Sequence, residues 1–507
     1  MTGQMTNGES VPGSIRRRLT YGAGPGERAG TEQGDVMPKN DEQKKDTGKR
    51  PEKKELRKGF TTGTCAAAAA KAAVRSLLGG AREKAVSLMT PGGLEAVFEV
   101  WWPGEEPGET AKQSVSGNGL AGGPGRERPG HRRERPGRRR EICAVRKDAG
   151  DDPDVTDGAL VYAAVWMPGE KSVLRKNGTD VSEETESGEH PGIYCDCREP
   201  VTVYIGGGRG IGRVTKRGLK CPPGYPAINP VPRRMIADAV REVLREYAES
   251  RPICVEISIP DGERLAEKTF NPHLGIVGGI SVLGTTGIVN PMSEEALLET
   301  IRLDIQVHAA EGRRLLAVAP GNYGAAFLLE SLGLSMESFV KCSNFVGETF
   351  QMFKKAGIRE VLFAGHLGKL VKVAGGVMNT HSKYGDRRME ILADCMEEAA
   401  RQAQEKGKGF ESFEREGKTE HKALAETLLS MNTTDEAAEL LKARGFLAPV
   451  MEIVTGRIKK VLEERFGLRT EVIVFSGASG ILGMTGGAED MAERLRELSG
   501  DPDAGNR

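Results

Sequence analysis

The sequence has few cysteines and no regular cysteine spacing. Its 8 cysteines are spread over 507 residues without a paired CxxC pattern, which argues against a disulfide framework and favours free thiols. Cys195 and Cys197 are the one close pair, beside His190, but the second pair that a zinc site normally supplies is missing. We therefore predict no metal site.

Long apolar runs and an excess of charge are also missing. A bilayer-spanning helix needs about 18 or more apolar residues, and the apolar stretch from Leu274 to Val289 is too short and is interrupted by glycine. We expect no secretory signal, because no apolar core follows the arginines near the start. Lys plus Arg and Asp plus Glu are equal at 72 each, so no overall field attracts nucleic acid or an anionic membrane. These features predict a soluble, cytoplasmic protein.

Hydrophobic residues are scarce and glycine is abundant. Hydrophobic residues make up 38% of the chain, whereas globular chains usually have about 45–50% apolar residues. Glycine accounts for 67 of the 507 residues. Part of the chain therefore lies outside any core. We predict a disordered tail over residues 1–55 and polar insertions near 103–140, 171–190 and 402–421, which lack apolar periodicity.

The remaining segments alternate between strand and helix patterns. Residues 56–272 predict an α+β domain, in which an alanine-rich helix begins near Thr64 and Ile253–Ile259 alternates as a half-buried strand. Residues 273–498 predict an α/β three-layer domain with a mostly parallel sheet, because strand, glycine loop and helix patterns repeat there.

Three glycine loops follow predicted strands of the second domain, at 320–324, 365–369 and 476–480. Ligands of parallel sheets collect at the carboxyl ends of strands. The loop Pro320–Gly324 opens a helix, whose N-terminal amides and dipole favour a carboxylate or a ribose. We predict a nucleoside-like cofactor there.

The densest polar cluster of the folded part comprises residues 365–372 and 379–388. His366 and His381 could transfer protons near neutral pH. Neighbouring cations could pair with substrate carboxylates, namely Lys369, Lys383, Arg387 and Arg388. The spacing between His366 and His381 fits no compact zinc ligand pair.

Two segments leave other functions open. Gly206–Gly212, followed by Arg213 and Lys216, could cradle a phosphate of a nucleotide-dependent phosphotransferase. It lacks the Gly-Lys-Ser/Thr of a Walker loop, and a tight hairpin explains it equally well. Arg126–Arg140, with eight Arg and two Glu, could bind nucleic acid, but without interleaved aromatic residues we favour a solvated insertion.

Five segments resemble, in order along the chain, the cobalt-precorrin-5B C1-methyltransferase family of anaerobic cobalamin biosynthesis. They are residues 57–69, 147–156, 224–236, 269–293 and 365–369. The resemblance covers most of residues 56–485. It implies that S-adenosylmethionine is the cofactor and that C1 of a cobalt-containing tetrapyrrole is methylated to give cobalt-precorrin-6A. The preceding, lactone-opening enzyme of the route is a candidate partner, and neither nucleic acid nor a membrane is expected as one.

Under this resemblance we assign three groups of site residues, all numbered in this sequence. The predicted cofactor-binding residues are Gly321, Asn322, Tyr323, Gly324, Asn344 and Glu348. The predicted substrate-binding residues, which would pair with acetate and propionate groups, are Arg233, Arg234, Lys369 and Lys383. Arg233 and Arg234 could equally be ordinary first-turn residues on a solvated helix face. The predicted catalytic residues are His366, His381 and Asp154. Asp154 belongs to a cluster with Asp148, Asp151 and Asp152 that ordinary loop and cap contacts could also explain.

Overall fold

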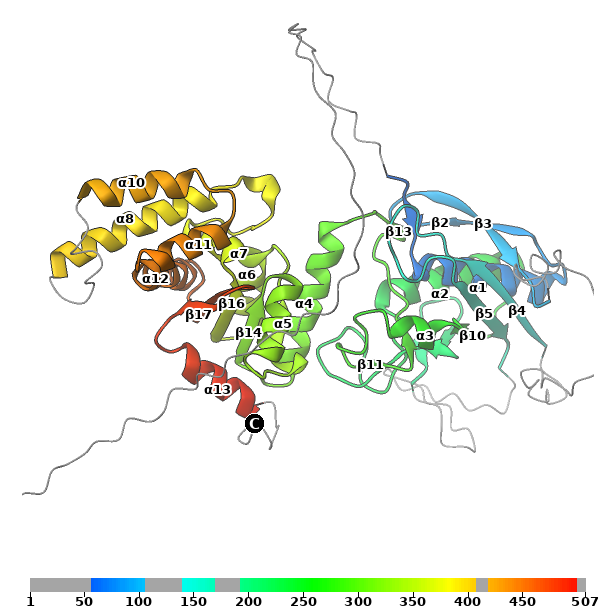
Figure 1. The fold of residues 1–507 in the computed structure, drawn as a ribbon. Coiled ribbons are helices and arrows are strands. Elements are labelled where there is room, and N and C mark those ends of the chain that lie inside the picture. Colours follow the sequence, from blue (N-terminus) through cyan, green and yellow to red (C-terminus); the bar gives the residue numbers. More distant parts are fainter. Residues whose placement is uncertain (1–55, 105–138, 169–191, 407–417, 499–507) are drawn as a thin grey trace, which may run out of the picture. The chain divides into compact units, whose positions relative to one another are not determined.

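The computed structural model describes residues 56–104, 139–168, 192–406 and 418–498 (Figure 1). The predicted tail at 1–55, most of the arginine-rich segment and the whole insertion at 171–190 lie outside these residues. The predictions made for those segments therefore stay untested. Elements are named in chain order as they are labelled in Figure 1.

A seven-stranded sheet dominates the first part of the described chain. Its order is β2 (Ala85–Met89), β3 (Glu95–Trp101), β4 (Arg140–Arg146), β5 (Leu160–Trp166), β10 (Ile253–Ser258), β7 (Val203–Gly207) and β6 (Tyr194–Asp196). All neighbours are antiparallel except β10 and β7, which are parallel. In the centre, Val255 pairs with both Val165 and Ile205.

Helix α1 (Thr62–Gly79) packs against helix α2 (Pro230–Glu246) and against strands β4 and β5. Its alanine run from Ala66 to Ala70 is fully buried, since small side chains let the helix approach the sheet closely. The side chain of Thr61 caps the helix by accepting from the Thr64 amide at 3.3 Å. The helix therefore begins at Thr62, slightly before the predicted start near Thr64.

Short strands beyond residue 272 pair with the first part of the chain. These pairs are β1 (Gly59–Phe60) with β13 (Ile288–Val289), β9 (Arg213–Val214) with β11 (Ile276–Val277), and β8 (Gly210–Ile211) with β12 (Gly279–Ile280). Helix α3 (Gly262–Ala266) lies between β10 and β11. These pairings cross the predicted domain boundary at residue 273, and the pairing partners change between β13 and α4 (Glu294–Ala310).

A second, five-stranded sheet follows in the order β15 (Phe339–Lys341), β14 (Leu315–Ala319), β16 (Glu360–His366), β17 (Arg469–Ser476) and β18 (Gly480–Met484). The first four strands are parallel and β18 is antiparallel. The prediction of a mostly parallel sheet in this half is confirmed. Together the two sheets make the chain a mixed α/β protein.

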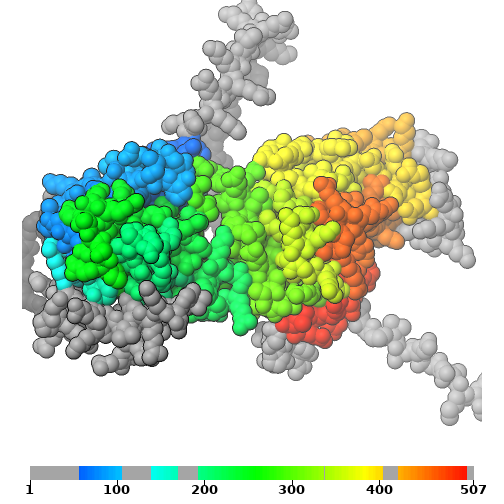
Figure 2. Space-filling model, turned by 180° about the vertical axis from the view of Figure 1, so that it is seen from behind, coloured from blue at the N-terminus to red at the C-terminus, as the bar shows by residue number. Residues whose placement is uncertain are grey.

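Helices cover both faces of the second sheet. Leu315 and Ala317 share one core with α5 (Gly321–Glu330) and α13 (Ala488–Leu498). Leu316 and Val318 face the other core. That core is formed with α6 (Val346–Ala356), α7 (Leu367–Ala374), α8 (Arg388–Lys406), α10 (Lys418–Leu429), α11 (Thr434–Ala443) and α12 (Leu447–Phe466), together with residues of α4. Helices α8 and α10 pack side by side in this layer, which appears yellow to orange in Figure 2.

Three expectations differ from the structure. The loop at 476–480 leads into the antiparallel strand β18 and not into a helix, so it closes a hairpin. The predicted polar insertion at 402–421 is partly helical, because α8 continues to Lys406 and α10 begins at Lys418. Cys195 and Cys197 form a disulfide where thiols were predicted. The other six cysteines are free and buried.

Within the described residues, every helix is too short or too polar to cross a membrane.

Candidate functional site

The carboxyl ends of β14, β15 and β16 lie next to one another, because these strands are parallel neighbours. Each is followed by a helix: α5 after β14, α6 after β15 and α7 directly after β16. Gly321 begins α5 with φ of 80°, a left-handed conformation that favours glycine. Asn344 follows β15, and Lys369 lies in the first turn of α7.

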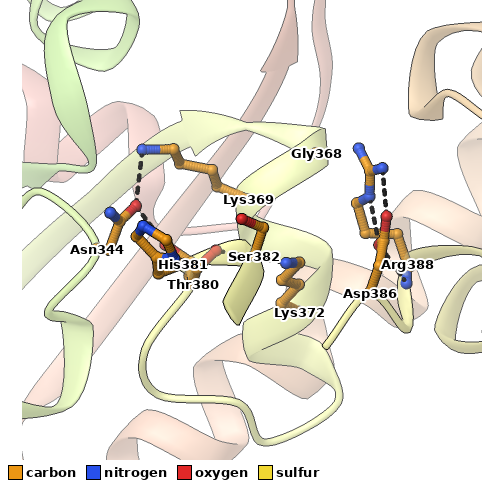
Figure 3. Close-up of a pocket in the computed structure, with 9 residues that line it drawn as sticks. All are labelled: Asn344, Gly368, Lys369, Lys372, Thr380, His381, Ser382, Asp386 and Arg388. Carbon is orange, nitrogen blue, oxygen red and sulfur yellow. Dashed lines mark hydrogen bonds and ion pairs between the residues drawn. The ribbon is translucent and has the colours of Figure 1, made fainter. Parts of the chain in front are cut away.

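A pocket of about 340 Å³ opens at these strand ends (Figure 3). Its lining residues come from the loop after β15, from α7 and from the segment before and at the start of α8. They are Asn344, Gly368, Lys369, Lys372, Thr380, His381, Ser382, Asp386 and Arg388. In Figure 3, Asn344 and Lys369 lie on one side of this group, and Asp386 and Arg388 lie on the other.

Lys369 connects the pocket to the glycine loop after β14. Its Nζ donates a hydrogen bond to Asn344 Oδ1 at 3.1 Å. A Cβ on Gly321 would lie 3.4 Å from the same Nζ, so this glycine is in van der Waals range of the ammonium group. Burial lowers the pKa of Lys369 below its ordinary value, and the nearby charge of Lys372 acts in the same direction.

Lys372, one turn further along α7, is buried, and its Nζ faces the carbonyl oxygens of Thr380 at 3.4 Å and Gly385 at 3.1 Å. Among the residues that the structure describes, neither Lys369 nor Lys372 forms an ion pair with a carboxylate. Arg388 instead makes two hydrogen bonds of 2.6 Å to Asp386. The pocket therefore carries an excess of positive charge that suits an anionic group.

The two predicted catalytic histidines both cap helices. His381 Nδ1 accepts from the Lys383 amide at 3.1 Å, and its exposed ring lines the pocket. His366 Nδ1 accepts from the Gly368 amide at 3.1 Å, and its Nε2 lies 3.5 Å from Asp435 Oδ1. Because Nδ1 is an acceptor in both rings, Nε2 carries the proton of the neutral form. His366 does not line the pocket, so the structure brings only His381 to it.

The predicted cofactor-binding residues separate into two sets. Asn344 lines the pocket and Gly321 lies beside Lys369 without lining it. Gly324 is buried against Ala319, where an added Cβ would lie 2.6 Å from the Ala319 Cβ, so it lets α5 pack closely on β14.

The remaining three lie on the outer surfaces of α5 and α6, and like Gly321 and Gly324 they do not line the pocket. Asn322 and Tyr323 are exposed on α5, with Tyr323 83% exposed. Glu348 is exposed on α6.

The predicted substrate-binding residues also lie in different places. Lys369 lines the pocket, whereas Lys383 is paired with Glu294, which raises the Lys383 pKa through their hydrogen bond. Arg234 is exposed on α2 and lines a second hollow of about 670 Å³ in the first part of the chain. Arg233 places its guanidinium carbon 3.8 Å from the centre of the Tyr194 ring.

Asp154 lies in a buried ionic contact of the first part of the chain. Its carboxylate pairs with Lys147, whose Nζ also donates to Thr156 Oγ1 at 2.7 Å. Burial would raise the pKa of Asp154, but Lys147 and Thr156 outweigh it and hold the pKa below its ordinary value.

The other aspartates of this cluster have structural partners. Asp148 and Asp151 bind Arg57, and Asp152 accepts from the Met292 amide at 2.9 Å. Loop contacts thus account for the acidic cluster.

The glycines of Gly206–Gly212 serve close backbone packing. A Cβ on Gly210 would lie 1.8 Å from the Ile259 carbonyl oxygen, and one on Gly212 would lie 2.7 Å from that of Gly279. The amides of Gly208, Ile211 and Gly212 already donate to backbone carbonyls. These amides are therefore not directed at a phosphate.

Two important pocket residues were not among the predicted sites. Lys372 follows Lys369 by three positions, which places both on one face of a helix, and this spacing was a usable signal. Thr380 is positioned by its Oγ1 contact with Asn344 Oδ1 at 3.3 Å, across 36 residues of sequence. Such a long-range contact leaves no local pattern.

Comparison with known proteins adds independent information. A sequence model of the family described as CbiD matches residues 49–119 and 132–291, and one described as the CbiD C-terminal domain matches residues 419–486. A cobalt-precorrin-5B C(1)-methyltransferase of Ruminiclostridium cellulolyticum is 37% identical over 466 residues, which are 89% of this chain and 98% of the relative. One from Thermoanaerobacter sp. is 36% identical over 440 residues, which are 86% of this chain and 97% of the relative.

A solved structure of a cobalamin biosynthesis protein (cbiD) from Archaeoglobus fulgidus is 24% identical, with a TM-score of 0.29. The match covers 69% of this chain and 85% of that protein. The family models match both ends of the described chain. The relatives are similar over nearly their whole length, so the chain belongs to the CbiD family.

Proposed function

We propose that this chain methylates C1 of cobalt-precorrin-5B to give cobalt-precorrin-6A in anaerobic cobalamin biosynthesis, with S-adenosylmethionine as the methyl donor. Membership of the CbiD family and relatives named for this reaction at 36 and 37% identity support the reaction. The convergence of Gly321, Asn344 and Lys369 at adjacent strand ends supports the place of the donor.

The pocket fits one ligand of nucleoside size. Its volume of about 340 Å³ is near the lower end of the roughly 300–1,000 Å³ found for small-molecule sites. It is therefore too small to enclose a tetrapyrrole together with the donor. Lys369 would hold the donor's carboxylate, Asn344 would meet its polar groups, and Gly321 would leave room for both.

The remaining cations suit the substrate. A tetrapyrrole of this pathway carries acetate and propionate groups, and Lys372 in the middle of the pocket and Arg388 on the side away from Asn344 offer donors. Arg388 uses two hydrogen bonds on Asp386, and a guanidinium has five N–H donors in all. Substrate carboxylates would accept hydrogen bonds from the Arg388 N–H groups that do not bind Asp386.

The chemistry requires positioning more than proton transfer. When bound, S-adenosylmethionine supplies a methyl group on a sulfonium, which an electron-rich ring carbon can attack in line. The protein then has to hold the two carbon atoms close and aligned, and such positioning alone can supply much of the rate. His381, whose Nδ1 is occupied by the Lys383 amide, would contact the substrate through Nε2 at the rim of the pocket.

The test is isothermal titration of the purified chain with S-adenosylmethionine and S-adenosylhomocysteine, with ATP and Mg²⁺ as the control. We expect both sulfur nucleosides to bind and ATP not to bind. Binding of ATP alone would contradict the proposal. If neither sulfur nucleoside binds even when the cobalt substrate is present, the placement of the donor fails.

A further inference from the structure

Two histidines and one aspartate form a buried group outside the pocket. His273 lies in a turn between α3 and β11, and Asp304 and His308 lie one turn apart on α4. One ligand atom from each residue lies within 4.8 Å of the other two. Asp304 and His308 are each only 2% exposed, so protein encloses the group.

Two distances within the group suit metal ligands, although they also suit ion pairs. Asp304 Oδ1 lies 3.2 Å from His273 Nε2 and 3.4 Å from His308 Nε2. A tetrahedral Zn²⁺ with bonds of about 2.0–2.1 Å keeps neighbouring ligand atoms about 3.3 Å apart. The two distances from Asp304 Oδ1 to the histidine nitrogens are close to this value.

His308 gives an independent sign that a partner belongs here. Both of its ring nitrogens are shielded from solvent, and neither makes a hydrogen bond of good geometry within the described residues, although Nε2 lies 3.4 Å from Asp304 Oδ1. Buried polar atoms nearly always have a partner, and a metal ion would bind the lone pair of Nε2. Glu311 Oε2 lies 3.9 Å from Nδ1, on the side where carboxylates commonly orient metal-binding histidines.

Local structure holds the three side chains in place. The Leu274 amide donates to the Phe270 carbonyl at 3.2 Å, which closes the turn around His273. The rings of Phe270 and His273 pack with centres 4.6 Å apart. Asp304 and His308, four positions apart, project from one face of α4, as helical ligand pairs of zinc sites do. The site is therefore preformed.

We propose that His273, Asp304 and His308 bind one Zn²⁺ ion, with a water molecule as the fourth ligand. Two imidazoles and one carboxylate suit Zn²⁺, whereas Mg²⁺ and Ca²⁺ prefer oxygen ligands alone. The ion fixes the turn that carries His273 to α4. Its role is structural, and it leaves the chemistry of the pocket unchanged.

The test uses the full-length chain, stripped of metal by a chelator and then equilibrated with Zn²⁺ alone. We expect one ion per chain in equilibrium dialysis, and a higher unfolding midpoint with Zn²⁺ than without it. Asp304→Asn keeps the shape of the side chain but removes its charge, and should weaken binding by at least about 100-fold. His273→Gln removes a ligand from a turn, and it provides a second variant if Asp304→Asn does not fold.

His421→Gln is the matched control, because it replaces a buried histidine elsewhere in the chain and should leave the stoichiometry unchanged. Equal Zn²⁺ binding by the wild type, Asp304→Asn and His273→Gln would overturn the proposal. Absence of bound Zn²⁺ in the wild type would also overturn it. Binding that is lost only in Cys195→Ser/Cys197→Ser would assign the ion to those thiols instead.

Discussion

Buried cations are held differently in the seven-stranded part of the chain and in the pocket of the second sheet. In the first region, Lys71 pairs with Glu242 at 2.7 Å, and Lys147 pairs with Asp154. Arg241 in the same region pairs with Asp196 at 2.9 Å. At the pocket, Lys369 and Lys372 face amide and carbonyl oxygens.

This difference separates two uses of positive charge. A buried charge costs free energy unless an opposite charge and hydrogen bonds compensate it. The pairs of the first region are compensated within the chain and need no ligand. The pocket lysines are compensated only in part. An anionic ligand would supply the negative charge that the protein does not place beside them.

The largest effect should follow from removing a carboxylate in the first region. Asp154→Asn leaves Lys147, whose side chain is 1% exposed, without a counter-ion. We expect the free energy of unfolding to fall by about 3 kcal/mol, measured by urea denaturation. If stability is unchanged while methyl transfer is lost, Asp154 is catalytic and not structural.

A double variant provides the control for this experiment. Lys147→Met/Asp154→Asn removes both charges and fills the space with an apolar side chain of similar length. It should recover much of the lost stability, because the cost of the single variant comes from the unpaired ammonium group. A double variant as unstable as Asp154→Asn would show that Asp154 acts through its other contacts.

Lys369→Met should weaken ligand binding at the pocket without a loss of stability, which is the reverse of the effect of Asp154→Asn. Loss of a charge-assisted hydrogen bond of about 1.5–3 kcal/mol would weaken S-adenosylmethionine binding by roughly 10- to 100-fold. Stability should stay equal or rise, because burial already disfavours the charged form of Lys369. Lys460→Met, on the exposed surface of α12, is the matched control in titration calorimetry and thermal unfolding. Unchanged affinity in Lys369→Met would remove this lysine from the donor site.

The contrast also explains what the sequence could predict. Strand and helix patterns placed β14, β16 and the helices after them correctly, because apolar periodicity and glycine loops are local signals. The strand pairings that cross residue 273 were not predicted. Strands of two residues, such as β11 and β13, have no periodicity of their own and are defined only by their distant partners.

Site residues followed the same rule. Asn344, Lys369 and His381, which were named because they lie just after predicted strands or within a dense polar cluster, line one pocket of the structure. The buried pairing of Asp154 and the histidine group at His273 were missed. Their chemistry depends on burial and on contacts across many residues of the chain, and neither is encoded in local spacing.

A third prediction concerns the acid stability of the first region. Burial opposes ionisation of Asp196, but Arg198 and Arg241 outweigh it and lower the Asp196 pKa to about 2. The folded pKa is below the ordinary value of 3.8, so the contribution is complete above that value and is lost as the pH falls through about 2. We estimate it at about 1–2 kcal/mol at neutral pH, after allowance for partial exposure.

The measurement compares urea unfolding of the wild type and Asp196→Asn between pH 7 and pH 2. The variant should be less stable at pH 7, and the difference should shrink as the pH falls. Asp261→Asn, at an exposed aspartate of the same region, should track the wild type throughout. A constant difference across this pH range would mean that the ion pairs of Asp196 do not carry the effect.

The smallest change in stability should follow from replacing His366. Its ring has partners within the chain, as the paired groups of the first region do, although it lies beside the pocket. His366→Ala removes the acceptor of the Gly368 amide and should lower the free energy of unfolding by about 1 kcal/mol. His366→Asn keeps a capping acceptor and should restore that stability, as thermal unfolding can measure. Turnover distinguishes the roles: a capping residue is rescued by asparagine, whereas a proton-transferring histidine is not. If both variants lose turnover while binding S-adenosylmethionine normally, His366 belongs with the pocket and not with the structural pairs.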